Sequence, residues 1–285
     1  MAILSIQSHV AFGHVGNAAA TFPLQRKGWE VWAVHTVMFA AHAGYGPPAG
    51  PIFSPETIRE VVAGLERQGF LSQCRAVLSG YLGDAALGEA VLDAVARVRK
   101  HNPDAVYCCD PVMGDAAPGV YVRDNIPDFM RDRAIPAADI ATPNAFELEL
   151  LTGIPIVRLE DAVASCQALR RSGPDTVLLT SLEREGTPDG MIEMLTVTGE
   201  GAWLVATPKL DLTPPPNGAG DLTAALFLAN LLDGLAPPDA LAATSASVQA
   251  VFQATARAGT RELAILDAQE AFVAPPAAFD AVSVG

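Results

Sequence analysis

Short apolar runs alternate with helix-like segments over residues 1–180, and this alternation limits the fold more than any other feature of the chain. Such a rhythm is typical of βαβ units, whose parallel strands form a sheet with helices on both faces. The expected strands cover residues 3–6, 29–34, 76–78, 105–109, 139–141 and 176–180. The expected helices cover residues 15–27, 55–68, 84–100, 143–151 and 160–171, the second of them capped by Ser54 with Pro55 and Glu56 behind it.

The pattern changes after residue 180. Residues 191–198 and 202–206 flank Gly199-Glu200-Gly201 and predict an antiparallel hairpin, and two helices follow over 220–232 and 238–256. The chain contains no linker, repeat or low-complexity segment. We therefore expect an α/β fold in one domain over residues 1–285, a three-layer αβα sandwich with a mostly parallel central sheet.

Composition excludes several classes of partner. The chain carries 18 Lys plus Arg against 32 Asp plus Glu, a net charge of −14, which argues against nucleic acid and anionic membranes. The four cysteines form no CxxC pair, and no apolar run reaches the roughly 18 residues of a membrane span. Free thiols in a reducing compartment are expected, and the predicted location is the cytoplasm.

The segment Asn217-Gly218-Ala219-Gly220-Asp221 directly precedes an apolar helical run. Glycines at a helix start let backbone N–H groups approach a ligand, and the positive end of the helix dipole favours an anion such as phosphate. Asp221 would repel that anion, so its presence needs another reason. Asp221 is explained if it acts as a general base, which takes the proton from a hydroxyl group as that group attacks a phosphate.

Other polar residues follow the ends of the expected strands, where ligands bind in open α/β sheets. Asp110 ends one strand, and Asn144 and Glu147 lie on one face at the start of a helix. Together they could organise Mg²⁺ and nucleotide phosphates, although Glu147 could also be only a favourable acid in a first helical turn. The loop from His42 to Pro48 carries a histidine and a tyrosine and could fold over an aromatic substrate, or these two side chains could be ordinary surface residues. The GxGxxG and GxxxxGK[ST] patterns and zinc-binding spacings are absent.

In order and spacing, these motifs resemble the ribokinase-like superfamily and, within it, the pyridoxal kinases of the PdxY type. The superfamily signature GxGD is matched at Gly218–Asp221. The closer resemblance covers nearly the whole chain and rests on IQSHV (6–10), GHVGN (13–17), FPLQRKG (22–28), HTV (35–37), LSGYLG (78–83), DPVMG (110–114) and TPNAFELELL (142–151).

The resemblance implies ATP-dependent phosphorylation of the 5′-hydroxymethyl group of pyridoxal, with pyridoxine and pyridoxamine as further substrates. Asp221 would be the general base, and the amides of Gly218, Ala219 and Gly220 would form the anion hole. The implied substrate pocket comprises Ser8, His42, Ala43, Gly44, Tyr45, Tyr81 and Asp221. The implied ATP site comprises Asp110, Thr142, Asn144, Glu147, Thr180, Thr207, Pro208, Lys209 and Leu210, with Asp110 and Glu147 also organising Mg²⁺. A homodimer and activation by K⁺ are implied as well.

The chain also departs from the pattern of the pyridoxal kinases. Ala43-Gly44 replaces Thr-Gln and removes two side-chain hydrogen-bond partners from the substrate loop. Val120 stands where some relatives carry a cysteine, Thr180 where a relative has a lysine, and Asn217 where many have Thr or Val. Two alternatives therefore stay open: a hydroxymethylpyrimidine or sugar kinase of the same superfamily, and a vitamer-binding protein that lacks turnover.

Overall fold

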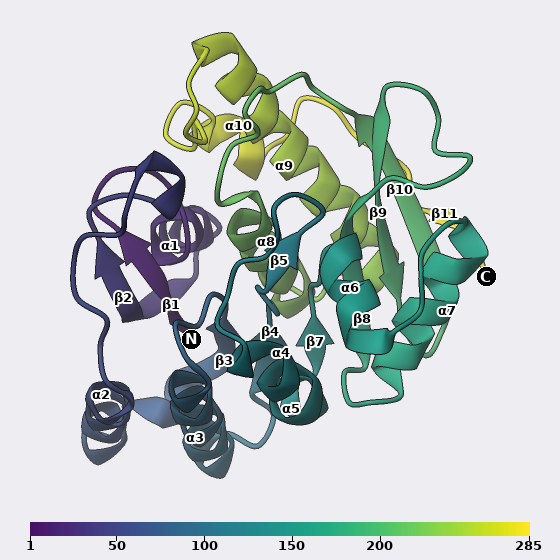
Figure 1. Cartoon of the computed structure of the whole chain (residues 1–285). Coiled ribbons are helices and arrows are strands. Elements are labelled where there is room, and N and C mark those ends of the chain that lie inside the picture. Colours follow the sequence, from purple (N-terminus) through teal and green to yellow (C-terminus); the bar gives the residue numbers. More distant parts are fainter.

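The computed structural model describes all residues from 1 to 285 and contains one nine-stranded sheet (Figure 1). The strand order is β11-β10-β9-β8-β7-β4-β3-β1-β2, and the pairs from β2 to β8 are parallel while β8 to β11 pair antiparallel. The strands are β1 (Ala2–Val10), β2 (Glu30–Phe39), β3 (Cys74–Ser79), β4 (Val106–Cys109), β7 (Ile140–Ala141), β8 (Thr176–Leu182), β9 (Met191–Val197), β10 (Ala202–Pro208) and β11 (Val282–Ser283), with β5 (Gly114–Asp115) and β6 (Gly119–Val120) in a separate two-stranded ribbon.

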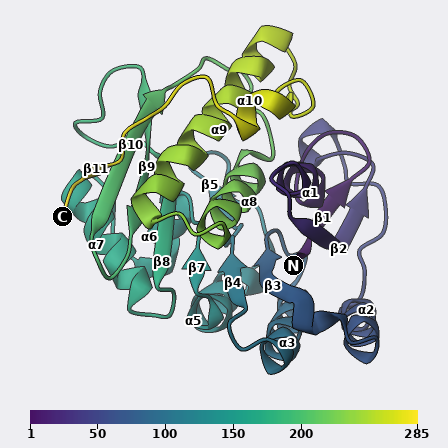
Figure 2. The ribbon, with the colours of Figure 1, turned by 180° about the vertical axis from the view of Figure 1, so that it is seen from behind.

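Helices cover both faces of the sheet. Figure 1 shows α4 to α7 in front of the sheet, and Figure 2 shows α1, α8 and α9 in front of its other face. The helices are α1 (Asn17–Arg26), α2 (Pro55–Arg67), α3 (Ala85–His101), α4 (Asn125–Phe129), α5 (Ile135–Ala137), α6 (Ala145–Thr152), α7 (Leu159–Arg170), α8 (Ala219–Leu232), α9 (Pro237–Ala258) and α10 (Gln269–Val273). The predicted three-layer α/β arrangement is confirmed.

The two cores follow from the alternation of side chains along each strand. Leu4 packs with α2 to α7, whereas its neighbour Ile3 packs with α1, α8 and α9. Cys109 and Cys108 divide between the two cores in the same way. Because both faces of the parallel strands are covered, these strands read as continuous apolar runs in the sequence.

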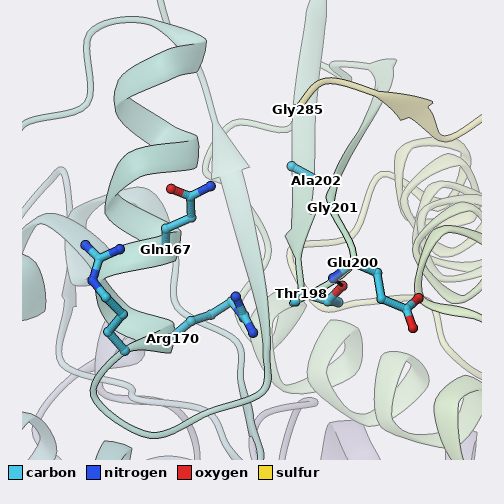
Figure 3. A pocket seen from close by; sticks show the side chains of 9 residues that line it. Gln167, Arg170, Thr198, Glu200, Gly201, Ala202 and Gly285 are labelled. Atoms are coloured by element: carbon cyan, nitrogen blue, oxygen red, sulfur yellow. Dashed lines mark hydrogen bonds between the residues drawn. The ribbon is translucent and has the colours of Figure 1, made fainter.

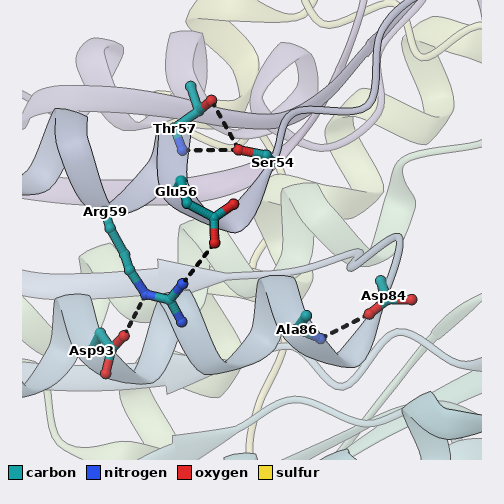
Figure 4. Close-up of polar contacts among 7 residues, drawn as sticks. All are labelled: Ser54, Glu56, Thr57, Arg59, Asp84, Ala86 and Asp93. Atoms are coloured by element: carbon teal, nitrogen blue, oxygen red, sulfur yellow. Dashed lines mark hydrogen bonds and ion pairs between the residues drawn. The ribbon is translucent and has the colours of Figure 1, made fainter.

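Caps and ion pairs define α2 and α3 (Figure 4). Ser54 Oγ accepts a hydrogen bond from the N–H of Thr57 at 3.2 Å, which confirms the predicted cap, and Asp84 Oδ1 accepts from the N–H of Ala86 at 2.9 Å. Arg59 on α2 donates to Asp93 on α3 at 2.7 Å. The two helices are thereby held side by side on one face of the sheet.

Two strands run further than the sequence predicts. The first was expected to end at residue 6 and the second at residue 34, but they continue to Val10 and Phe39. A register shift after Gln7 lets His9 pair with Met38 and Val10 with Phe39. The polar residues Ser8, His9 and Thr36 therefore lie within strands, and the loop begins only after Phe39. No helix of the structure has the length and apolar character needed to cross a membrane.

Candidate active site

A cleft of about 640 Å³ opens beyond the carboxyl ends of the parallel strands. This is the place where open α/β sheets bind ligands, and most of the residues predicted from the sequence line it. They are Ser8, His42, Ala43, Gly44, Tyr81, Asp110, Thr142, Asn144, Glu147, Thr180, Thr207, Gly218, Ala219, Gly220 and Asp221.

The glycine turn forms the start of α8. Gly218 caps the helix in a left-handed conformation with φ of 86°, and a Cβ there would lie 1.8 Å from the carbonyl oxygen of His14. Only glycine fits this position without moving the β1–α1 loop. Asp221 follows in the first turn of α8, open to the cleft and surrounded by protein on its other sides.

The electrostatic state of Asp221 suits an acceptor of protons. Burial raises its pKa from the ordinary 3.8 to about 6, opposed by a hydrogen bond from the backbone of Gly16. A carboxyl with such a pKa is ionised at neutral pH and is a stronger base than an exposed aspartate.

A second group of polar side chains lies across the cleft floor. Asp110 is buried at the end of β4 and accepts a hydrogen bond from Thr142 Oγ1 at 3.0 Å. Burial, followed by the charges of Glu147 and Asp221, raises the pKa of Asp110 well above its usual range. No group of three or more acidic, His or Cys side chains is close enough together to hold a metal ion by itself.

Glu147 is held by backbone amides at both of its oxygens. Its Oε1 accepts from Met113 N at 2.9 Å, and its Oε2 accepts from Asn144 N at 3.0 Å. Asn144 Oδ1 in turn accepts from Glu147 N at 2.8 Å, which completes a capping box at the start of α6. Burial nevertheless raises the pKa of Glu147 to about 7. Glu147 is therefore an acid that stabilises the start of α6, one of the two alternatives considered for it. It also lines the cleft, which is compatible with the other alternative, a role in organising Mg²⁺.

The opposite end of the cleft is lined by Ser8, His42 and Tyr81. His42 Nδ1 accepts a hydrogen bond from Gly44 N at 3.0 Å and so caps the short 3₁₀ helix Ala43–Tyr45, which has one turn. Burial raises the pKa of the Tyr81 hydroxyl and keeps it neutral. The side chains at this end of the cleft are therefore the hydroxyl of Ser8, the imidazole of His42 and the phenol of Tyr81.

A separate hollow of about 360 Å³ lies where the end of α7 meets the β9–β10 hairpin (Figure 3). It is lined by Gln167, Arg170, Thr198 and Glu200 among others, and it contains none of the residues predicted for the site. Arg170 donates to the carbonyl of Asp175 at 2.8 Å, so this guanidinium already serves the turn after α7.

Known proteins resemble the chain in sequence and in fold. The family model described as phosphomethylpyrimidine kinase matches residues 60–265. A pyridoxal kinase PdxY from Rubrobacter xylanophilus is 55% identical over 97% of this chain and 95% of its own, and one from Deinococcus radiodurans is 52% identical over 99% and 96%. The chain belongs to the pyridoxal kinase family. Within the ribokinase-like superfamily, it resembles the PdxY type. The solved structure of Leishmania donovani pyridoxal kinase with ADP and pyridoxine matches it with a TM-score of 0.92 at 29% identity, covering 99% of each chain.

Some residues assigned from the family pattern lie outside the cleft lining. Tyr45 is not among the cleft-lining residues, and its hydroxyl donates to Glu262 Oε1 at 2.7 Å. Pro208, Lys209 and Leu210 also lie outside, and Lys209 instead pairs with Glu183 at 2.6 Å on the surface. Only Thr207 of that stretch lines the cleft: Pro208 is the last residue of β10 and follows Thr207 on the opposite face, and Lys209 and Leu210 lie beyond the strand.

The structure adds cleft residues that the family motifs did not indicate. Ser245, Val248, Gln249 and Phe252 line the cleft from one face of α9. Their spacing in the sequence is that of a single helical face, but the sequence analysis predicts only a helix over 238–256 and assigns no side chain of it to the site. Gln249 was the available signal: it is an amide in an apolar helix, and its Nε2 is buried without a partner.

Proposed function

We propose that the protein transfers the γ-phosphoryl group of ATP to the 5′-hydroxymethyl group of pyridoxal, forming pyridoxal 5′-phosphate in vitamin B6 salvage. The observation that carries this is Asp221, a base with raised pKa placed at the glycine turn of α8 in the main cleft. The relatives named pyridoxal kinase and the Leishmania donovani complex with ADP and pyridoxine support the same activity.

In this reaction, Asp221 accepts the proton of the substrate hydroxyl as its oxygen attacks phosphorus. The amides of Gly218, Ala219 and Gly220, together with the α8 dipole, stabilise the negative charge on the transferring group. The vitamer is surrounded by Ser8, His42, Ala43, Gly44 and Tyr81. Tyr45 is the last residue of the 3₁₀ turn that also contains Ala43 and Gly44.

A magnesium ion is proposed beside Asp110 and Glu147, where two carboxyls with buried side chains face the main cleft. Burial raises the pKa of both groups, and a divalent cation beside them would favour their ionised forms. Asp110 and Glu147 would hold Mg²⁺, which neutralises charge on the nucleotide phosphates when bound. Activation by K⁺ is a further proposal from the family resemblance.

The nucleotide end of the cleft is proposed to involve Thr142, Asn144, Thr180 and the strand 207–210, of which Thr207 lines the cleft. The free amide nitrogen of Gln249 is available to the nucleotide from α9. We further propose one kinase domain over residues 1–285, a homodimer and a cytoplasmic location. Sedimentation velocity of the purified protein tests the dimer.

The function is tested with purified protein, Mg-ATP and a panel of hydroxymethyl compounds. Pyridoxal is expected to yield pyridoxal 5′-phosphate with stoichiometric ADP, and pyridoxine and pyridoxamine are assayed beside it. Preference for hydroxymethylpyrimidine or a sugar would replace the proposal with the corresponding kinase. Tight pyridoxal binding by calorimetry without ADP release would identify a vitamer-binding protein instead.

The pH dependence follows from the pKa of Asp221. The carboxylate must be ionised to accept a proton, so kcat/KM for pyridoxal is expected to be level above about pH 7 and to fall about tenfold per pH unit below about pH 6. Initial rates from pH 5 to 9 under saturating Mg-ATP measure this profile. An acid limb near pH 4, the range of an ordinary aspartate, would contradict the assignment.

A further inference from the structure

Glu262 joins three segments that are distant in the sequence and that all border the cleft. It lies in the connection between α9 and α10 and is only 9% exposed. Its Oε1 accepts from Tyr45 Oη at 2.7 Å and its Oε2 from His14 N at 2.9 Å. The backbone of Glu262 also bridges to that of Asn217, directly before the glycine turn.

The neighbouring Arg261 contacts the same 3₁₀ turn from its outer side. Its Nη2 donates to the carbonyl oxygen of Gly44 at 3.1 Å, and its guanidinium carbon lies 4.4 Å from the centre of the Tyr45 ring. A charged donor and a cation–π contact are among the stronger polar interactions that an exposed segment can make.

The guanidinium of Arg261 occupies the space that a side chain at residue 44 would need. A Cβ on residue 44 would lie 2.7 Å from Arg261 Nη2, so the guanidinium fits here because residue 44 has no side chain. Ala43-Gly44 provides the turn with no polar side chain of its own, and Arg261 supplies a hydrogen-bonding group to it from the other end of the chain.

The turn has few other restraints. Residues 43–50 are exposed, and three hydrogen bonds within the turn hold the backbone: Gly44 N to His42 Nδ1 at 3.0 Å, Tyr45 N to His42 O at 3.0 Å and Gly46 N to Ala43 O at 3.1 Å. A short exposed segment of this kind loses much conformational entropy when it orders over a ligand. Contacts that order the turn before binding therefore increase the affinity for a ligand that the turn covers.

We propose that Arg261 and Glu262 are positioning residues that hold the His42–Tyr45 turn over the substrate end of the cleft and thereby set the affinity for the vitamer. This inference rests on the proposed function. Arg261 contacts only the turn, through Gly44 and Tyr45, whereas Glu262 also touches His14 and Asn217 beside the glycine turn. The effect of Arg261 is therefore the one confined to the hydroxymethyl substrate.

Steady-state kinetics with both substrates test the proposal. Arg261→Ala is expected to raise KM for pyridoxal by about 5- to 30-fold, the size of one or two lost hydrogen bonds, and to change KM for ATP less than twofold. Tyr45→Phe removes only the hydroxyl donated to Glu262 and should raise the same KM in the same direction. Arg257→Ala is the matched control, because Arg257 is exposed on the last turn of α9 and makes no polar contact.

A double-mutant cycle separates positioning from a general loss of structure. Gly44→Ala should displace Arg261 and reproduce the effect of Arg261→Ala, and the double variant should be no worse than either alone. Hydrogen exchange at the amides of residues 44–46 should accelerate in Arg261→Ala, in Gly44→Ala and in the double variant. It should stay unchanged in Arg257→Ala. An active enzyme whose KM for pyridoxal is unaltered by Arg261→Ala, or additive effects in the cycle, would overturn the inference. Absence of pyridoxal 5′-phosphate formation by the unmodified protein would overturn the proposed function instead.

Discussion

Replacing Asp221 with alanine is expected to lower kcat for pyridoxal by about 10²–10⁴-fold, the usual contribution of a general base. Asp221 lies in the first turn of α8 at the glycine turn, and its raised pKa makes it the best-placed proton acceptor in the cleft. Because the loss concerns the chemical step, KM for ATP should change little. Stopped-time assays of pyridoxal 5′-phosphate formation measure both parameters.

Asp221→Asn is the matched control for folding. The pKa of Asp221 is raised to about 6 in the folded chain, so its protonated form is favoured there, and that advantage disappears as the pH rises through about 6. At pH 8 the ionised side chain therefore costs up to about 3 kcal/mol of unfolding free energy, which a neutral asparagine avoids. The variant should be inactive but at least as stable to urea at pH 8. An undiminished rate in either variant would remove Asp221 from the mechanism.

The sequence predicts the architecture and one edge of the site well because both depend on local patterns. Apolar runs and amphipathic periods indicate the strands and helices, and the rule that ligands bind beyond strand ends brings Asp110, Thr142 and Asp221 into one cleft. Strand ends were less predictable. Ser8 and Thr36 are polar and read as loop, yet pairing between β1 and β2 extends both strands past them.

Contacts across the chain were beyond prediction. Tyr45 is predicted for the substrate pocket, and nothing in its local sequence indicates that its hydroxyl donates to a carboxylate 217 positions away. Neither Arg261 nor Glu262 belongs to a recognisable motif, and nothing in local periodicity pairs them with residue 44. For the same reason, the sequence does not indicate that Arg261 hydrogen-bonds the carbonyl of Gly44 and occupies the space that a side chain at residue 44 would need.

Gly218→Ala is expected to lower kcat by at least about 10²-fold and to destabilise the fold. A left-handed conformation costs an alanine about 1–2 kcal/mol, and its methyl group would also overlap the carbonyl oxygen of His14. To relieve that overlap, the glycine turn or the β1–α1 loop has to move, and the anion-hole amides move with the turn. Loss of one such donor typically costs 10²–10³-fold in kcat. Kinetics and urea unfolding of the purified variant measure the two effects.

Gly220→Ala tests whether backbone geometry is the cause. The φ angle of Gly220 lies outside the left-handed range, and the nearest atom to an added Cβ would be Asp110 Oδ2 at 3.8 Å, an ordinary contact. Alanine also favours helix, so this variant should fold at least as stably as the unmodified protein and lose much less activity than Gly218→Ala. If both variants lost activity equally while remaining fully folded, bulk near the transferring phosphoryl group would explain the losses. A Gly218→Ala variant that kept its rate and stability would show that the left-handed turn is not required for the anion hole.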